Sequence, residues 1–183
     1  MALSNRIRFK AADIWDTPDD GKRYEVIDGQ LYVSPPPVLE HQGASGALYE
    51  YIAPFIRRRR LGKLYSAPVG VVLDVENGVQ PDLVYVSRER SHILGRRGIE
   101  GAPNLVVEIL SPSTRARDRG IKLRRYAAAG VPHYWIVDPR TRALEARRLT
   151  EQGYELTGTY GPGSTFRPEL FPGLEIPIDD LWA

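Results

Sequence analysis

Cysteine is absent from the 183 residues, and lysine and histidine are scarce. Without thiols the chain has no disulfides and no thiolate metal site, and its three histidines lack the paired spacing of a structural zinc site. No apolar stretch approaches the ~20 residues of a membrane span, and the N-terminus has no apolar signal region. We therefore expect a cytoplasmic protein that does not enter a membrane.

The size and charge of the chain set further bounds. A length of 183 residues suits one domain with a single core, and no repeat or linker divides it. We expect a single domain over 1–183, with a core at about 22–140 and a C-terminal hairpin and extended tail at 141–183. A net charge of +2 is compatible with nucleic acid but does not identify it as a partner. Most basic residues are arginine, and the lysines are Lys10, Lys22, Lys63 and Lys122.

Hydrophobic periodicity predicts an α/β fold with two main helices. An Asp-Gly step between alternating runs predicts a hairpin over 23–33. Apolar residues at steps of three and four predict a helix over 38–60, and a second helix over 114–129 should end at Gly130. These helices should flank a mixed sheet with strands at 64–66, 69–74, 79–86, 105–110 and 133–139. The other predicted elements are a turn at 76–78, a hairpin over 144–160, and a tail that ends in a turn at 178–182.

Two acids stand where the pattern calls for hydrocarbon. Glu108 interrupts the apolar strand 105–110, and Asp82 comes immediately before the apolar run 83–86. An unpaired buried charge costs several kcal/mol, so Glu108 needs a lysine, an arginine or a metal ion nearby. Each acid alone is compatible with an ordinary turn residue. Together, on neighbouring strands, they can face one pocket and hold a hard divalent cation.

The helix over 114–129 carries Asp118, Lys122 and Tyr126 at spacings of four, which places them on one face. Two interpretations remain open. Asp118 and Lys122 can form a surface ion pair worth ~0.3 to 0.5 kcal/mol. Alternatively, Lys122 is presented to the pocket that holds Glu108.

Two further polar residues have more ordinary interpretations. His41 lies on the apolar stripe of the helix 38–60, which favours a hydrogen-bonded core histidine over a catalytic one. Glu25 is expected to face solvent from the 23–33 hairpin. The residues of that hairpin that we expect to cover the core are Tyr24, Val26, Leu31 and Val33.

Several stretches together resemble the Uma2 family, bacterial proteins related to restriction endonucleases within the PD-(D/E)XK nuclease superfamily. The similarity covers nearly the whole chain, and the order and spacing of the motifs are specific. It implies a restriction endonuclease-like core, a mixed sheet between helices. The matching stretches are RYEVIDG at 23–29, QPDLV at 80–84, GAPNLVVEILSPST at 101–114, the helical stretch 118–126 and YWIVDP at 134–139.

The resemblance also implies roles for individual residues. Asp82 matches the acid of the Pro-Asp motif and Glu108 the second acid, so both are implied metal ligands and catalytic residues. Glu25 matches an early acid of the family. Superfamily members commonly carry a lysine two residues after the second acid, where this chain has Leu110; the resemblance points instead to Lys122 in the following helix.

The expected activity is that of a Mg²⁺-dependent endonuclease that hydrolyses DNA phosphodiester bonds, with Mn²⁺ as a possible substitute. The expected partners are DNA and a second copy of the chain in a homodimer. Two alternatives are an inactive nucleic-acid-binding or interaction protein that retains the fold, and an enzyme acting on small phosphate esters. Accessory candidates are His41, Ser111 and Tyr126, and the candidate phosphate contacts are Arg115, Arg117, Arg119, Arg124 and Arg125.

Overall fold

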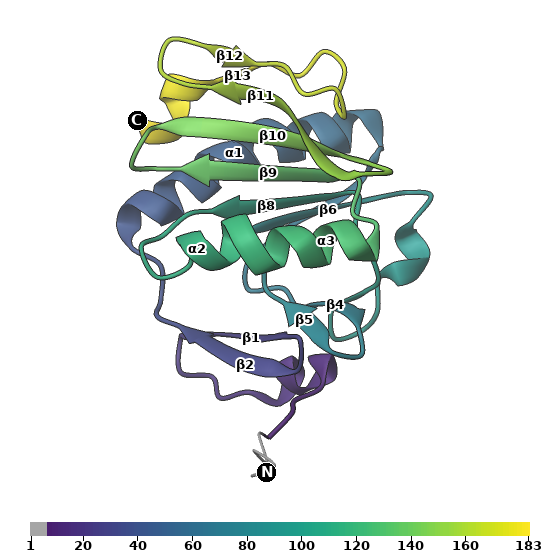
Figure 1. Ribbon diagram of the computed structural model, residues 1–183. Helices are drawn as coiled ribbons and strands as arrows, with labels where there is room; N and C mark the ends of the chain where they lie inside the picture. Colours follow the sequence, from purple (N-terminus) through teal and green to yellow (C-terminus); the bar gives the residue numbers. More distant parts are fainter. Residues whose placement is uncertain (1–6) are drawn as a thin grey trace.

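The computed structural model describes residues 7–183 as a mixed α/β fold with two main sheets (Figure 1). The six-stranded sheet has the order β11-β10-β9-β8-β6-β3. Its strands are β3 (Gly62–Ser66), β6 (Leu83–Ser87), β8 (Leu105–Ile109), β9 (His133–Asp138), β10 (Ala143–Thr150) and β11 (Gly153–Tyr160). The five-stranded sheet, in the order β2-β1-β5-β4-β7, consists of β1 (Arg23–Ile27), β2 (Gln30–Ser34), β4 (Val71–Asp74), β5 (Asn77–Val79) and β7 (Ile99–Glu100).

Helices cover both faces of the six-stranded sheet. Figure 1 shows α1 (Leu39–Arg59) behind it and α3 (Leu123–Ala129) in front. The strand β8 is buried on both sides because its residues alternate between these layers: Val107 packs with α1, and Val106 packs with Tyr126 of α3. A mixed sheet between helices, as expected from the sequence, is therefore confirmed.

The second predicted helix has the expected extent but not a uniform geometry. It consists of α2 (Arg115–Arg117), a π-helical segment η3 (Asp118–Lys122) and α3. It ends at Gly130, whose φ of 81° is left-handed and therefore suits glycine. The π-helical segment was not predicted; such segments often occur at functional sites.

The β1–β2 hairpin forms at the expected place, with φ of 53° at Asp28 and 69° at Gly29. Positive φ at both positions matches the twist of the two strands. The prediction that Leu31 and Val33 cover the core is wrong, since both are exposed. They lie on β2, the edge strand of its sheet, whereas the buried Val26 lies on the inner strand β1.

Two other connections refine the sequence prediction. The predicted turn at 76–78 lies one to two residues too late, because β5 begins at Asn77. The Asn77 side chain donates to Asp74 at the end of β4 and accepts from the backbone N–H of Asp28 in the β1–β2 turn. The Arg-rich connection after β6 contains a short 3-10 helix, η2 (Ser91–Ile93), before β7.

The C-terminal region follows the predicted hairpin and tail. After β10 and β11, the short strands β12 (Thr165–Phe166) and β13 (Ile176–Pro177) pair, and a 3-10 helix η4 (Ile178–Trp182) follows. Phe171 of the tail is fully buried in the cluster beneath α1. Among the described residues, no helix combines the length and apolar character needed to cross a membrane.

Candidate active site

The β6–β8 pairing brings Asp82 and Glu108 together. These strands are antiparallel, and their ladder ends at Leu83 opposite Val107. Just beyond this pair, the backbone N–H of Asp82 donates to the carbonyl of Val107, the residue before Glu108, at 3.1 Å. The backbone N–H of Ile109 donates to Asp82 Oδ2 at 2.7 Å, which ties the acid to β8. Both acids are 1% exposed.

Lys122 lies at the centre of a group of buried carboxylates. Its Nζ is 2.5 Å from Glu108 Oε1, 2.8 Å from Glu25 Oε1 and 3.4 Å from Asp118 Oδ1. All four side chains are almost fully buried, so neither a surface Asp118–Lys122 pair nor a solvated Glu25 describes this chain. Lys122 is presented to the pocket that holds Glu108.

Tyr126, one helical turn after Lys122, completes the surroundings of Glu108. Its hydroxyl donates to Glu108 Oε1 at 2.6 Å, and its ring is fully buried. The spacing of Asp118, Lys122 and Tyr126 therefore does place all three on one inward face, as predicted. This face meets the strand β1, which supplies Glu25.

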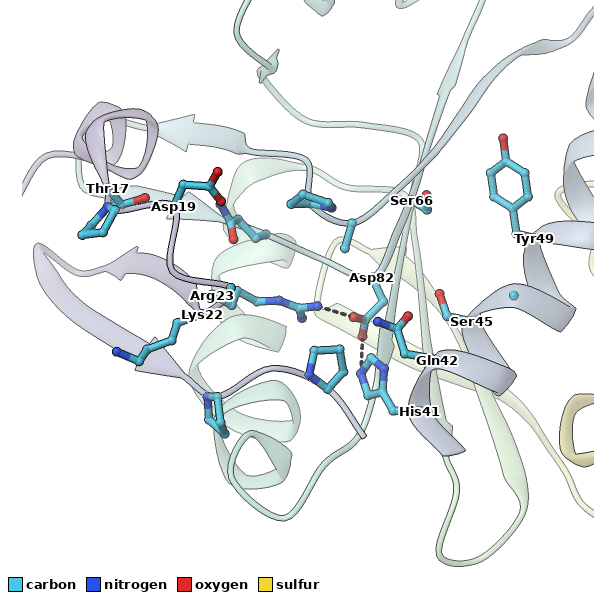
Figure 2. A pocket seen from close by; sticks show the side chains of 18 of the residues that line it. Thr17, Asp19, Lys22, Arg23, His41, Gln42, Ser45, Tyr49, Ser66 and Asp82 are labelled. Carbon is cyan, nitrogen blue, oxygen red and sulfur yellow. Dashed lines mark hydrogen bonds and ion pairs between the residues drawn. The ribbon is translucent and has the colours of Figure 1, made fainter. Parts of the chain in front are cut away.

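Asp82 is held by two basic side chains from other elements (Figure 2). The Arg23 guanidinium of β1 donates to Oδ1 at 2.7 Å, and His41 Nε2 of α1 lies 3.3 Å from Oδ2. His41 is buried, as the core interpretation required, but its contact is an acid of the candidate site rather than a backbone group.

Asp82 and Glu108 have different pKa values because their surroundings differ. Burial by itself raises the pKa of Asp82, but the hydrogen bond from His41 and the charge of Arg23 outweigh burial and lower the pKa to about 2. Burial raises the pKa of Glu108 to about 8, with neighbouring acids adding to the effect against the attraction of Lys122. Neighbouring acids whose pKa values are pushed apart are typical of catalytic sites.

The lysine remains the cation of the cluster. Burial disfavours the charged Lys122, but the carboxylates of Glu108, Glu25 and Asp118 outweigh burial and raise its pKa above the ordinary value. For Glu25 the balance of burial against the Lys122 charge lowers the pKa, and burial raises the pKa of Asp118. Burial and the neighbouring acids thus raise the pKa of Glu108 far enough to favour its protonated form at neutral pH, against the attraction of Lys122.

The candidate phosphate-binding arginines mostly have partners within the chain. Arg115 forms a bidentate pair with Asp138, Arg119 does so with Glu145, and Arg125 Nε lies 2.6 Å from Asp28. Arg117 donates to Ser34 Oγ, and Arg124 is exposed. Ser111, which follows β8, contacts the hydroxyls of Ser113 and Thr114 with its own hydroxyl.

Two members of the site were not identified from the sequence. Arg23 stands two residues before Glu25 on one strand, so both project to the same face; this period-2 spacing was an available signal. Asp118 was placed on the Lys122 face by its spacing, but its burial beside Glu108 depends on β1 and β8 covering that face.

Comparison with known proteins identifies the family and the fold of this chain. The sequence profile described as "Uma2: Putative restriction endonuclease" matches residues 11–179. This chain belongs to the Uma2 family. A crystal structure of a "putative nuclease belonging to DUF820" from Anabaena variabilis has the same fold, with a TM-score of 0.77, 18% identity, and coverage of 95% of this chain and 97% of that one. No curated protein sequence matches.

The acids of this Uma2 chain could supply part of the oxygen ligands of a hard cation such as Mg²⁺. Within residues 7–183, no three His, Asp or Glu side chains are gathered so that they enclose a metal ion by themselves. Mg²⁺ usually keeps several waters and is held by one or two carboxylates together with substrate phosphate oxygens. The buried carboxylates of Asp82 and Glu108 match that requirement in number and in donor type.

Proposed function

We propose that this protein is a Mg²⁺-dependent endonuclease that hydrolyses phosphodiester bonds of DNA. The observation that carries the proposal is that Lys122 Nζ lies within 2.8 Å of a carboxylate oxygen of both Glu25 and Glu108. Asp82 is tied to the same strand as Glu108 through the backbone N–H of Ile109. Membership of the Uma2 family and the nuclease-like fold support the same reaction class.

Asp82 and Glu108 are the residues that would hold Mg²⁺, with Mn²⁺ as a substitute. The ion supplies stabilisation of negative charge on the phosphoryl and leaving oxygens and favours deprotonation of water. For Glu108 to serve as a ligand it must lose the proton that its raised pKa favours, since a carboxylate binds the cation.

The chain's own groups supply positioning and charge. Lys122 brings the positive charge that stabilises the transition state, and Glu25 fixes the ammonium at 2.8 Å. Tyr126 orients the Glu108 carboxyl through its hydroxyl. Arg23 and His41 orient Asp82. Fixed groups of this kind need no reorganisation during the reaction.

DNA and a second copy of the chain remain proposed partners. Arg124 is exposed, and arginines such as Arg125, now paired with Asp28 at the surface, can exchange a carboxylate for a phosphate. Phosphate contacts predict binding that weakens steeply with salt. Light scattering coupled to size-exclusion chromatography tests the homodimer.

Cleavage assays test the activity directly. Supercoiled and linear DNA are incubated with Mg²⁺, Mn²⁺ or a chelator, and we expect cleavage only with a divalent ion. Asp82→Asn and Glu108→Gln should each reduce cleavage at least about 100-fold, as loss of a principal catalytic interaction does. Glu151→Gln, an exposed acid in the β10–β11 turn, is the matched control.

The result that contradicts the proposal is DNA binding without cleavage under any metal condition. That outcome favours the alternative of a binding protein that retains the nuclease fold. Cleavage of small phosphate esters but not of DNA supports the other alternative.

A further inference from the structure

A groove of about 700 Å³ opens beside the candidate active site, and Asp82 lies in its wall (Figure 2). One wall is a face of α1. The other walls come from the loop before β1, the segment after β3 and the residues before β6. Residues of α1 that line the groove recur at helical spacing: His41, Gln42, Ser45, Gly46, Tyr49 and Glu50.

The burial of the acids restricts how a substrate can reach them. Glu25, Glu108 and Lys122 are each 1% exposed, and these three do not line the groove, whereas Asp82 does. Of these four residues the groove therefore reaches Asp82, and a phosphate that meets Asp82 enters along it. The volume falls within the roughly 300–1,000 Å³ of pockets that enclose a small ligand, so the groove has room for a single nucleotide.

The lining of the groove has the groups that bind an unpaired base. Tyr49 supplies an aromatic ring, and stacking of a base on an aromatic side chain contributes about 1–3 kcal/mol. Gln42 and Ser45 present an amide and a hydroxyl from the same helix face, which can bond to the exposed edges of an unpaired base. Arg23 also lines the groove at the Asp82 side, where its guanidinium donates to Asp82 Oδ1.

We propose that this groove receives one nucleotide of single-stranded or locally unpaired DNA and thereby makes unpaired DNA the preferred substrate. In a duplex, the base must first leave its stack and its pair. That step costs a few kcal/mol and costs least when the base is mismatched or already single-stranded.

The α1 glycines provide a matched pair of variants. A Cβ at Gly46 or at Gly43 meets no atom within 4 Å, so a side chain can begin at either position without a clash at its Cβ. Gly46 lines the groove and Gly43 does not. Gly46→Gln should therefore partly fill the groove, while Gly43→Gln makes the same chemical change elsewhere on the same helix.

The experiment measures binding of labelled oligonucleotides by fluorescence anisotropy, with a chelator present. We expect a single-stranded decamer to bind at least about tenfold more tightly than the same sequence in a duplex. Gly46→Gln should weaken single-strand binding by at least about tenfold, and Gly43→Gln should leave it unchanged. Equal affinity for the two DNAs, no binding of either, or equal behaviour of the two variants overturns the inference.

The inference rests on the proposed nuclease function, but the two can fail separately. Groove-dependent binding without cleavage in Mg²⁺ or Mn²⁺ refutes the catalytic proposal and leaves the groove inference in place. Metal-dependent cleavage that is equal on paired and unpaired DNA and unaffected by Gly46→Gln refutes the groove inference alone.

Discussion

Removal of the Lys122 charge is the perturbation whose effect follows most directly from the structure. Lys122→Met keeps much of the side-chain length but leaves Glu25, Glu108 and Asp118 without the ammonium that now lies 2.5–3.4 Å from them. We expect the free energy of unfolding at pH 8 to fall, because buried acids then face one another without a cation.

The size of the loss follows from two opposing effects. At an effective dielectric constant near 20, one ion pair at 2.5–2.8 Å is worth about 6 kcal/mol before desolvation. Taking the ammonium out of water offsets much of this, and removing one partner of a buried pair costs about 3–5 kcal/mol. Because the free energy of unfolding of a whole domain is about 5–15 kcal/mol, a loss of this size removes a large share of it.

Urea denaturation measures this loss. Lys63→Met is the control, because Lys63 is exposed on β3 and its replacement should change stability by no more than about 0.5 kcal/mol. Adding Glu108→Gln to Lys122→Met should recover part of the loss, since it removes an uncompensated acid. A loss below about 1 kcal/mol for Lys122→Met, or no recovery in the double variant, contradicts this account of the cluster.

Three further predictions concern protons and salt. The pKa of Glu108 is raised from 4.5 to about 8 in the folded chain. Its contribution to the free energy of unfolding is therefore complete below about pH 4.5 and is lost as the pH rises through about 8. Glu108→Gln should make the free energy of unfolding, measured with urea, less dependent on pH between about pH 5 and 9. Binding of Mg²⁺ at pH 7 should release close to one proton if Glu108 is a ligand, which calorimetry in buffers of different ionisation enthalpy detects as a buffer-dependent heat. Arg125→Ala should lower the free energy of unfolding by less than about 1 kcal/mol, because the Arg125–Asp28 pair is partly exposed. If Arg125 contacts a phosphate, the variant should also lower the slope of log affinity for DNA against log salt concentration by about one. An unchanged slope removes Arg125 from the DNA interface.

Local patterns in the sequence predicted most of the secondary structure. The Asp-Gly hairpin, the helix α1 and the strand β8 each follow from residues close together in the chain, where periodicity and turn chemistry act. Glu108 also stood out locally, because its neighbours in the strand are apolar and a buried charge requires a partner. The family motifs then implied catalytic roles for Asp82 and Glu108, which the strand pattern had already singled out, and for Glu25.

Only the tertiary structure decided how those candidates meet. Glu25 and Lys122 are 97 positions apart and Arg23 and Asp82 are 59 apart, so their contacts depend on how β1 packs against the six-stranded sheet and its helix. For the same reason the exposure of Leu31 could not be predicted: whether β2 is an inner or an edge strand is a property of the assembled sheet. Amino-acid sequence determined which groups are available, while sheet register and packing determined their distances, their burial and hence their charge states.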